Sequence, residues 1–281
     1  MWIGNPGALR EIRDGAKSFE RAPDLGVVEF RALAGGVTTW APPALPRRLK
    51  LSWEAMERGD VDHLDRLARR VDAPGPIAAV DPLARNLLGA AQAAGRGSPK
   101  KWSWTNSDFV LYGGSLSEYI PNTVSVENVP TANGPDLFWD HPTWPGYPVA
   151  PGMTVTWWTP GLVAGGAALG QLRIQWFDAS GALLSTGTTN APTVPMVRPV
   201  PAGAAYARPA ARFTAKGLWG MGSSAFTLGD TSAALVAGER PAGEGCPAVS
   251  VTGYSHAPAD GNGAFRDIGL DLVEVTSSAT G

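Results

Sequence analysis

The chain has 281 residues, enough for two modest domains, and only 17% of them are charged, with a formal net charge of −2. There is no surplus of basic residues to neutralise phosphates, which argues against nucleic acid as a partner. A single cysteine excludes an internal disulfide framework and a cysteine-rich metal site, while 35 Gly and 25 Pro indicate many short strands and turns. The first residues lack signal-peptide character and no apolar run is long enough to span a bilayer, so we expect neither export by that route nor membrane insertion.

The N-terminal part reads as short strands around one helix. Apolar and polar residues alternate as in strands at residues 26–31, 37–40, 49–53 and 77–80. Between the last two, a helix is expected to start at Asp60, a suitable N-cap. Its apolar stripe consists of Val61, Leu64, Leu67, Ala68 and Val71.

Residues 146–189 carry the clearest strand pattern. After a Pro/Gly turn, Trp157 alternates with threonines, and Ile174 and Trp176 share one face of a second strand, so both tryptophans are expected in a core. A tight Asp-Ala-Ser-Gly turn follows at residues 178–181. Two antiparallel strands need a second sheet to bury their apolar face, which indicates a β-sandwich.

We expect this sandwich to occupy residues 98–241. The small and polar residues 89–101 read as a linker before it. About eight short strands separated by turns suit a jelly roll. Pro209 would interrupt one of these strands, which indicates a sheet edge or a bulge at that position.

Two final strands, at residues 248–252 and 266–275, follow a second joint rich in Gly and Pro. Two strands alone are marginal in water, so they need a host sheet. We infer that they return to the N-terminal residues, giving a discontinuous domain of residues 1–95 and 243–281 with the sandwich inserted; the alternative is that they extend the sandwich. The predicted fold class is therefore mainly β: a small β-rich domain with one helix, plus a jelly-roll β-sandwich.

The sequence contains no recognisable catalytic or metal-binding pattern. His63 is expected on the polar side of the helix, and His141 and His256 in loops, none with metal-ligand spacing. Cys246 has no base nearby and reads as a small packing residue. The Gly-rich residues 161–170 read as a loop between strands rather than a phosphate cradle. We therefore expect no enzyme activity, no metal and no cofactor.

The eleven tryptophans are the feature best suited to binding. Trp139, Asp140, Trp144 and Tyr147 lie in a Pro-rich stretch that reads as a loop. Their aromatic faces could stack on a sugar ring while Asp140 and His141 hold its hydroxyls. Alternatively, the rings cover the open end of the sandwich or pack against a neighbouring subunit.

Three segments of the sandwich resemble a known family. Residues 148–158 (PVAPGMTVTWW), 174–183 (IQWFDASGAL) and 200–208 (VPAGAAYAR) are similar to the carbohydrate-binding-module-like jelly rolls of the galactose-binding superfamily. The chain departs from that pattern at Pro209, where the family strand usually continues with β-branched residues. The resemblance implies the sandwich fold, and it says little about a sugar site.

A second resemblance covers nearly the whole chain. The opening MWIGNPG, residues 80–88 (VDPLARNLL) and residues 267–275 (DIGLDLVEV) resemble minor tail proteins of actinobacteriophages and, more broadly, the distal tail proteins of long-tailed phages. In that family the N-terminal domain forms a ring, usually six-fold, which joins the tail tube to the tip proteins, and an outer sandwich decorates it. Such a ring closes through a head-to-tail interface.

This resemblance implies a structural virion protein at the phage tail tip, synthesised in the host cytoplasm. Its expected partners are further copies of itself in a six-fold ring, the tail tube protein and the tail tip or hub proteins. The outer sandwich could contact host glycans. The alternative is a stand-alone carbohydrate-binding module of the lectin type.

Overall fold

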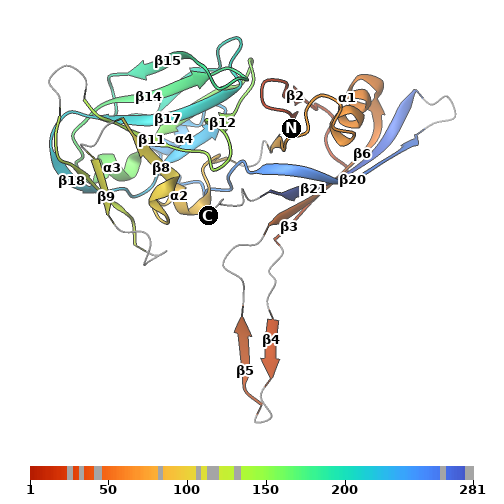
Figure 1. The fold of residues 1–281 in the computed structure, drawn as a ribbon, viewed down its shortest axis with the longest axis horizontal. Coiled ribbons are helices and arrows are strands. Elements are labelled where there is room, and N and C mark those ends of the chain that lie inside the picture. The colour runs from red at the N-terminus through yellow and green to blue at the C-terminus, as the bar shows by residue number, and fades with distance from the viewer. Residues whose placement is uncertain are drawn as a thin grey trace. The chain divides into compact units, whose positions relative to one another are not determined.

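The structure is a computed structural model that describes residues 1–23, 28–31, 35–40, 46–81, 85–105, 109–112, 120–129, 134–259 and 264–275. It is mainly β, with 46% strand, 12% helix and several antiparallel sheets, which confirms the predicted fold class (Figure 1). The chain divides into two compact units. The terminal unit comprises Ile3–Asn5, Glu11–Ala79 and Pro247–Gly281, and the central unit comprises Met1–Trp2, Pro6–Arg10 and Val80–Cys246.

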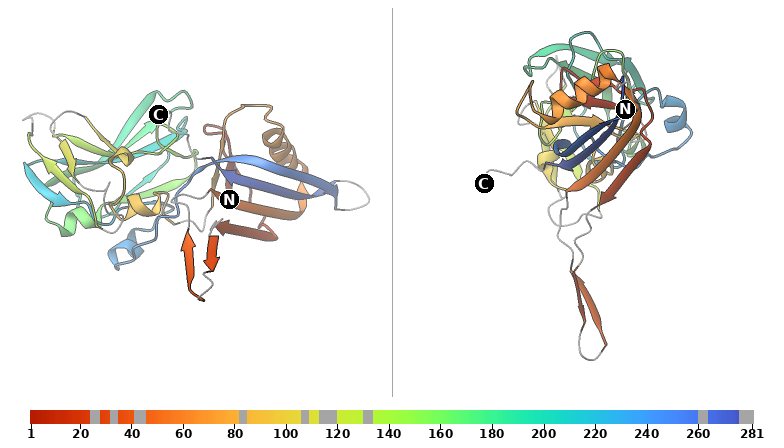
Figure 2. Two further views of the ribbon diagram at one scale, coloured as in Figure 1. Left: turned by 60° about the horizontal axis from the view of Figure 1, so that its bottom comes forward. Right: turned by 90° about the vertical axis from the view of Figure 1, so that its right-hand side faces the viewer.

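A seven-stranded sheet underlies the terminal unit, in the order β2-β1-β7-β20-β21-β6-β3. Its strands are β1 (Trp2–Gly4), β2 (Arg10–Glu11), β3 (Ser18–Pro23), β6 (Arg47–Glu57), β7 (Ile77–Val80), β20 (Ala248–Pro258) and β21 (Phe265–Glu274). The helix α1 (Arg58–Ala68) lies on one face of this sheet and packs against β6, β20 and β21 (Figures 1 and 2).

The two C-terminal strands pair with strands of the N-terminal part. β21 runs antiparallel to β6, with Leu270 opposite Leu51 and Ile268 opposite Trp53, and β20 continues the sheet to β7. All four side chains are at most 3% exposed. Because they alternate with polar residues, one face of the hairpin must be covered, and α1 covers it. This is the return of the last strand pair that the sequence predicts.

The helix begins earlier than predicted. α1 follows β6 directly, so its N-cap is Glu57 and Asp60 lies in the first turn instead of capping it. The helix ends at Ala68, and Arg70 adopts a positive φ of 54°. Val71 therefore leaves the apolar stripe and is 57% exposed, whereas Val61, Leu64 and Leu67 are buried as expected.

A separate hairpin interrupts the terminal sheet between β3 and β6. The paired ends of these strands are Pro23 and Arg47. Within the excursion, β4 (Val28–Arg31) and β5 (Val37–Trp40) form a two-stranded antiparallel sheet of their own.

The central unit contains the expected β-sandwich. Its six-stranded sheet follows the order β15-β14-β17-β11-β8, with β12 also beside β17, and three-stranded sheets follow the orders β16-β13-β19 and β18-β10-β9. The strands are β8 (Trp102–Trp104), β9 (Phe109–Tyr112), β10 (Thr123–Val126), β11 (Asp136–Trp139), β12 (Tyr147–Pro148), β13 (Thr154–Trp158), β14 (Leu169–Phe177), β15 (Leu183–Thr189), β16 (Met196–Pro199), β17 (Tyr206–Phe213), β18 (Gly217–Gly220) and β19 (Ala225–Leu228). Short helices join them: α2 (Ala90–Ala93), α3 (Pro160–Ala164), α4 (Ser232–Val236) and the 3-10 helix η1 (Pro99–Lys101).

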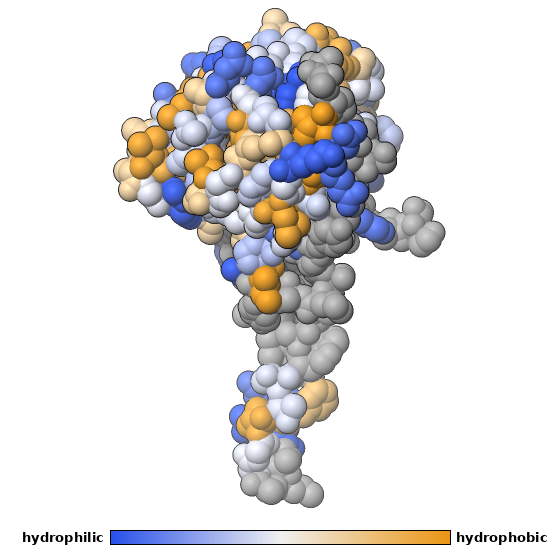
Figure 3. All heavy atoms as spheres, turned by 90° about the vertical axis from the view of Figure 1, so that its left-hand side faces the viewer, coloured by the Kyte–Doolittle hydropathy of each residue, from blue (hydrophilic) through white to orange (hydrophobic). Residues whose placement is uncertain are grey.

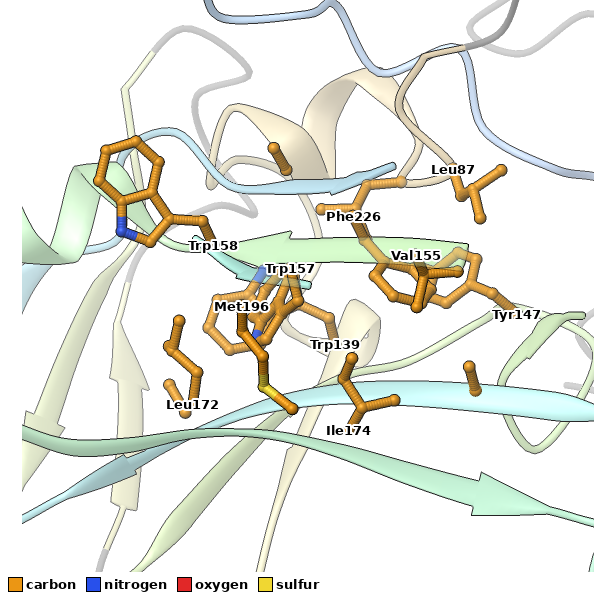
Figure 4. Packing of buried hydrophobic residues seen from close by; sticks show 14 of the residues in the cluster. Leu87, Trp139, Tyr147, Val155, Trp157, Trp158, Leu172, Ile174, Met196 and Phe226 are labelled. Atoms are coloured by element: carbon orange, nitrogen blue, oxygen red, sulfur yellow. The ribbon is translucent and has the colours of Figure 1, made fainter. Parts of the chain in front are cut away.

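Side chains from two sheets meet in one core. Figure 4 shows Trp157 and Met196, from β13 and β16, facing Trp139 and Ile174, from β11 and β14. The rings of Trp139 and Trp157 meet edge to face at 4.8 Å between centroids, and Trp157 Nε1 donates to Ala210 O at 2.9 Å. The predicted core positions of Trp157 and Trp176 are confirmed, since these side chains are 0% and 3% exposed.

The predicted linker at residues 89–101 is instead a packed part of the sandwich. α2 and η1 form there, and Gln92 and Ala93 are buried. The small residues permit close packing: a Cβ on Gly95 would lie 2.5 Å from Gly222 O. The small residues that suggested a flexible linker instead allow two backbone segments to pack in direct contact.

Two further expectations in the sandwich are wrong. Pro209 lies neither on an edge nor at a bulge, because β17 runs between β14 and β11. On one side of β17 the pairing with β11 extends to Phe138 opposite Ala210, and the pairing with β12 begins with Tyr147 opposite Ala207. Pro209 lies between these two ladders, where a missing N–H costs little. The Gly-rich residues 161–170 begin with α3 rather than being a loop throughout.

Candidate functional site

The residues predicted to bind a sugar lie within or at the ends of the loop between β11 and β12. Trp139, at the end of β11, is 0% exposed, and Tyr147, at the start of β12, is 1% exposed. Enclosed rings cannot stack on an external sugar, so this part of the prediction is wrong. The reason is that β11 and β12 both pair with β17, which carries the two ends of the Pro-rich segment into the sheet.

The Tyr147 hydroxyl joins the loop to α2. It donates to Gln92 Oε1 at 2.5 Å and lies 3.3 Å from Asp140 O. Gln92 Nε2 in turn donates to Lys101 O at 2.7 Å and to Asp140 O at 3.0 Å. Complete burial raises the pKa of Tyr147 well above its ordinary value, so the phenol remains protonated. Sequence reasoning missed Gln92 because its segment read as a linker.

His141 lies in a loop as predicted, but it is buried, with 7% of its surface exposed. Its Nε2 donates to Cys246 O at 2.8 Å, and its Nδ1 accepts from the backbone N–H groups of Thr143 and Trp144 at 3.0 and 3.2 Å. These partners require a neutral ring with the proton on Nε2. Burial lowers the pKa of His141 to about 4, so the ring holds the loop in its uncharged form.

Two of the four predicted residues do reach the surface. Trp144 is half-buried and stacks on His141 with 4.8 Å between ring centroids. The Asp140 carboxylate accepts from Arg208 Nε at 2.7 Å, and the Arg208 guanidinium lies 4.3 Å above the ring of Phe138. Arg208 is 68 residues from Asp140, and no local pattern in the sequence could have indicated the pair.

The other residues considered in the sequence analysis are His63, His256 and Cys246. His63 Nε2 lies 2.9 Å from Ile3 O. His256 is on β20 rather than in a loop, so that expectation is wrong. Cys246 is buried and not in a disulfide, in keeping with a packing residue. Among the described residues, no three His, Cys, Asp or Glu side chains are grouped to hold a metal ion, and no helix is long and apolar enough to cross a membrane.

The terminal sheet offers a different kind of candidate site, one for association between chains. Among the described strands, β2 and β3 are the outermost of this sheet, and they differ in length and sequence. Phe19 on β3 is 36% exposed. An outer strand such as β3 is a place where the backbone of another chain can add to a sheet.

The β4–β5 hairpin is a second candidate contact. Its strands pair with each other, and within the described ranges with no further strand. Phe30 and Val37 are 59% and 55% exposed. A two-stranded hairpin is marginally stable at best in water. Both properties suit a segment that becomes buried against a partner.

The surface seen in Figure 3 mixes hydrophobic and hydrophilic residues. In the central unit, the exposed large apolar side chains include Leu183, Leu184 and Leu218. Scattered apolar residues of this kind are normal for a protein surface and do not mark a binding site by themselves.

Comparison with known proteins adds little to this geometry. No protein-family model and no curated protein matches the sequence. Among solved structures, that of arabinose-bound MgGH51 α-L-arabinofuranosidase matches over 58% of this chain and 28% of that chain, with 12% sequence identity and a TM-score of 0.30. This chain therefore corresponds to less than a third of that enzyme's length. A likeness at this level establishes neither a shared fold nor a shared activity.

Proposed function

We propose that this chain is a structural protein of a phage tail that forms a six-membered ring at the distal end of the tail tube. The ring connects the tube protein to the tip or hub proteins. The terminal unit builds the ring, and the sandwich is an outer domain that could contact host glycans. In this role the protein acts by assembly and catalyses no reaction.

The observation that carries the proposal is the outer strand β3 of the terminal sheet, on which Phe19 is 36% exposed. A ring requires a heterologous interface, in which one surface of each subunit meets a different surface of the next. β3 of one copy would supply one such surface, and it would meet a different surface of the next copy. The exposed Phe30 and Val37 of the β4–β5 hairpin supply a further surface that benefits from burial. The sequence resemblance to distal tail proteins supports the same reading.

The test is the oligomeric state of the full chain, measured by mass photometry and negative-stain electron microscopy with and without tail tube protein. We expect rings of about six times the monomer mass of 29.3 kDa. Phe19→Lys places a charge on the edge strand β3 and should leave the chain folded but monomeric. Leu218→Lys, an equally drastic change at a 63% exposed site in the central unit, should still give rings.

Rings of normal size from Phe19→Lys would reject β3 as the interface. A parent chain that stays monomeric even with tube protein would reject the ring altogether. The second candidate function, a stand-alone lectin, is favoured by the partly exposed Trp144, which lies near Asp140 in the same loop. In that case a monomer should bind glycans on an array, and Trp144→Ala should abolish the binding.

A further inference from the structure

A pocket of about 350 Å³ lies within the terminal unit, between α1 and the β20–β21 hairpin. From the helix it is lined by Arg58, Asp62, Asp65 and Arg69. Their spacing of four, three and four residues places them on one stripe of α1, next to the stripe that packs on the sheet. The function proposed above makes no use of this pocket.

The sheet contributes rings and one more cation. Tyr254 and His256 are two residues apart on β20, so they project from the same face, with 5.8 Å between ring centroids and 33° between planes. Arg266 of β21 completes this wall. The Tyr254 hydroxyl is buried and has no hydrogen-bond partner among the described residues, which costs free energy unless a ligand or water supplies one.

The Tyr254 hydroxyl is a donor at neutral pH. Burial and, secondly, the negative charge of Asp65 raise the pKa of Tyr254 above its ordinary value, so the phenol keeps its proton. A ligand beside it must therefore offer an acceptor.

The charges of the pocket largely balance one another. Arg58 Nε lies 3.7 Å from Asp62 Oδ2, and Arg69 Nε lies 2.9 Å from Asp65 Oδ2. A free cation would meet carboxylates that are already paired, and a phosphate would meet two carboxylates. The pocket is instead rich in hydrogen-bonding groups. Its carboxylates accept hydrogen bonds, and its guanidinium and phenol groups donate them.

We propose that this pocket binds one saccharide unit. The rings of Tyr254 and His256 contact the apolar face of the sugar, and the planar groups of Asp62 and Arg58 bond to neighbouring hydroxyls. With a small shift of the exposed side chains around it, the Tyr254 hydroxyl donates to a sugar oxygen and thereby gains the partner it lacks. The volume is at the lower end of the range for ligand pockets, which fits a single ring rather than an oligosaccharide. The proposal does not depend on ring assembly.

The test is calorimetric titration of the full chain with galactose, N-acetylglucosamine and glucuronic acid in turn. We expect at least one to bind with a Kd on the order of 1 mM. Tyr254→Phe keeps the ring and removes only the hydroxyl, so it should weaken that affinity roughly threefold to tenfold. Asp62→Asn removes a charged acceptor from an exposed site and should weaken it roughly tenfold or more.

A matched control and a discriminating variant locate the effect. Asp271→Asn makes the same chemical change at an exposed position of β21 that does not line the pocket, and it should bind as the parent does. Trp144→Ala removes the ring of the candidate lectin loop and decides between that loop and the pocket as the sugar site. Unchanged unfolding temperatures in all variants exclude a folding defect. The proposal is overturned if none of the three sugars binds, if Tyr254→Phe and Asp62→Asn bind normally, if inorganic phosphate competes with the sugar, or if Trp144→Ala alone removes binding.

Discussion

His141 illustrates how burial decides the chemistry of one residue. Its three hydrogen-bond partners are all backbone groups, and the two that donate to Nδ1 require the neutral ring. Protonation would place a charge in a buried site and would remove the acceptor that Thr143 and Trp144 share. The loop between β11 and β12 is therefore sensitive to acid.

We expect the free energy of unfolding to decrease as the pH falls from about 6.5 to about 4. The pKa of His141 is about 4 in the folded chain and near 6.5 in the unfolded chain, so the unfolded chain takes up the proton first. The loss over this interval is roughly 3 kcal/mol. Urea unfolding at several pH values measures it. His141→Gln should be less stable at neutral pH and lack this component, whereas His256→Gln, at an exposed site, should retain it; equal pH profiles for parent and His141→Gln would contradict the assignment.

Individual core residues could be predicted where the local pattern is regular. Trp157 and Trp176 were placed correctly because alternation along a strand fixes which side chains point inward. Trp139 and Tyr147 were not, because their neighbours in sequence are prolines and polar residues typical of a loop. Their burial depends on pairing with β17, about sixty to seventy residues further along the chain. The sequence around Trp139 and Tyr147 does not indicate which distant strand they will pair with.

Among the elements, α3 is held in place by close packing of glycines. A Cβ on Gly161 would lie 2.4 Å from Ser223 N and 2.5 Å from the carbonyl carbon of Gly222. Gly161 N also donates to Ser223 O at 2.9 Å. The short helix thus fits directly against the backbone that leads into β19.

Gly161→Ala should destabilise the central unit by about 1–3 kcal/mol, because the added methyl group forces apart two backbone segments. Thermal unfolding followed by calorimetry measures this change. Gly220→Ala is the matched control: it has no atom within 4 Å of the added methyl and should change stability little. A Gly161→Ala protein as stable as the parent would show that α3 shifts freely.

Elements with strong periodicity were predicted, and those built from small residues were not. The stripe of α1 was readable, although its start was misplaced because β6 passes into the helix without a loop. The same helix carries the Arg58–Asp62–Asp65–Arg69 stripe, whose spacing is visible in the sequence and could have suggested a polar site. By contrast, α2 has the composition of a linker, and its packing depends on contacts such as those of Gln92 with Lys101 and Asp140.

At the scale of the whole molecule, the most informative prediction was that the two C-terminal strands pair with the N-terminal part of the chain. Two isolated strands cannot bury their apolar faces, so the C-terminal pair had to join an existing sheet. The pairing of β21 with β6 agrees with the predicted return. The units divide at residues 79–80 and 246–247, whereas the sequence suggested 95 and 243. Local sequence patterns could not show that β21 pairs with β6 and β20 with β7. Ring formation itself remains a proposal.

The pairing of β6 with β21 has a consequence for biosynthesis. Arg47 Nε and Glu274 Oε2 lie 2.9 Å apart although 227 residues separate them in sequence. While the chain is being translated, β6 has no β21 beside it until residues 265–274 leave the ribosome, whereas the strands of the sandwich are complete much earlier. Because β3 pairs with β6, an unfinished polypeptide lacks a completed sheet on which β3 can be displayed. In the ring proposed above, a chain that ends before β21 should therefore fail to join its neighbours.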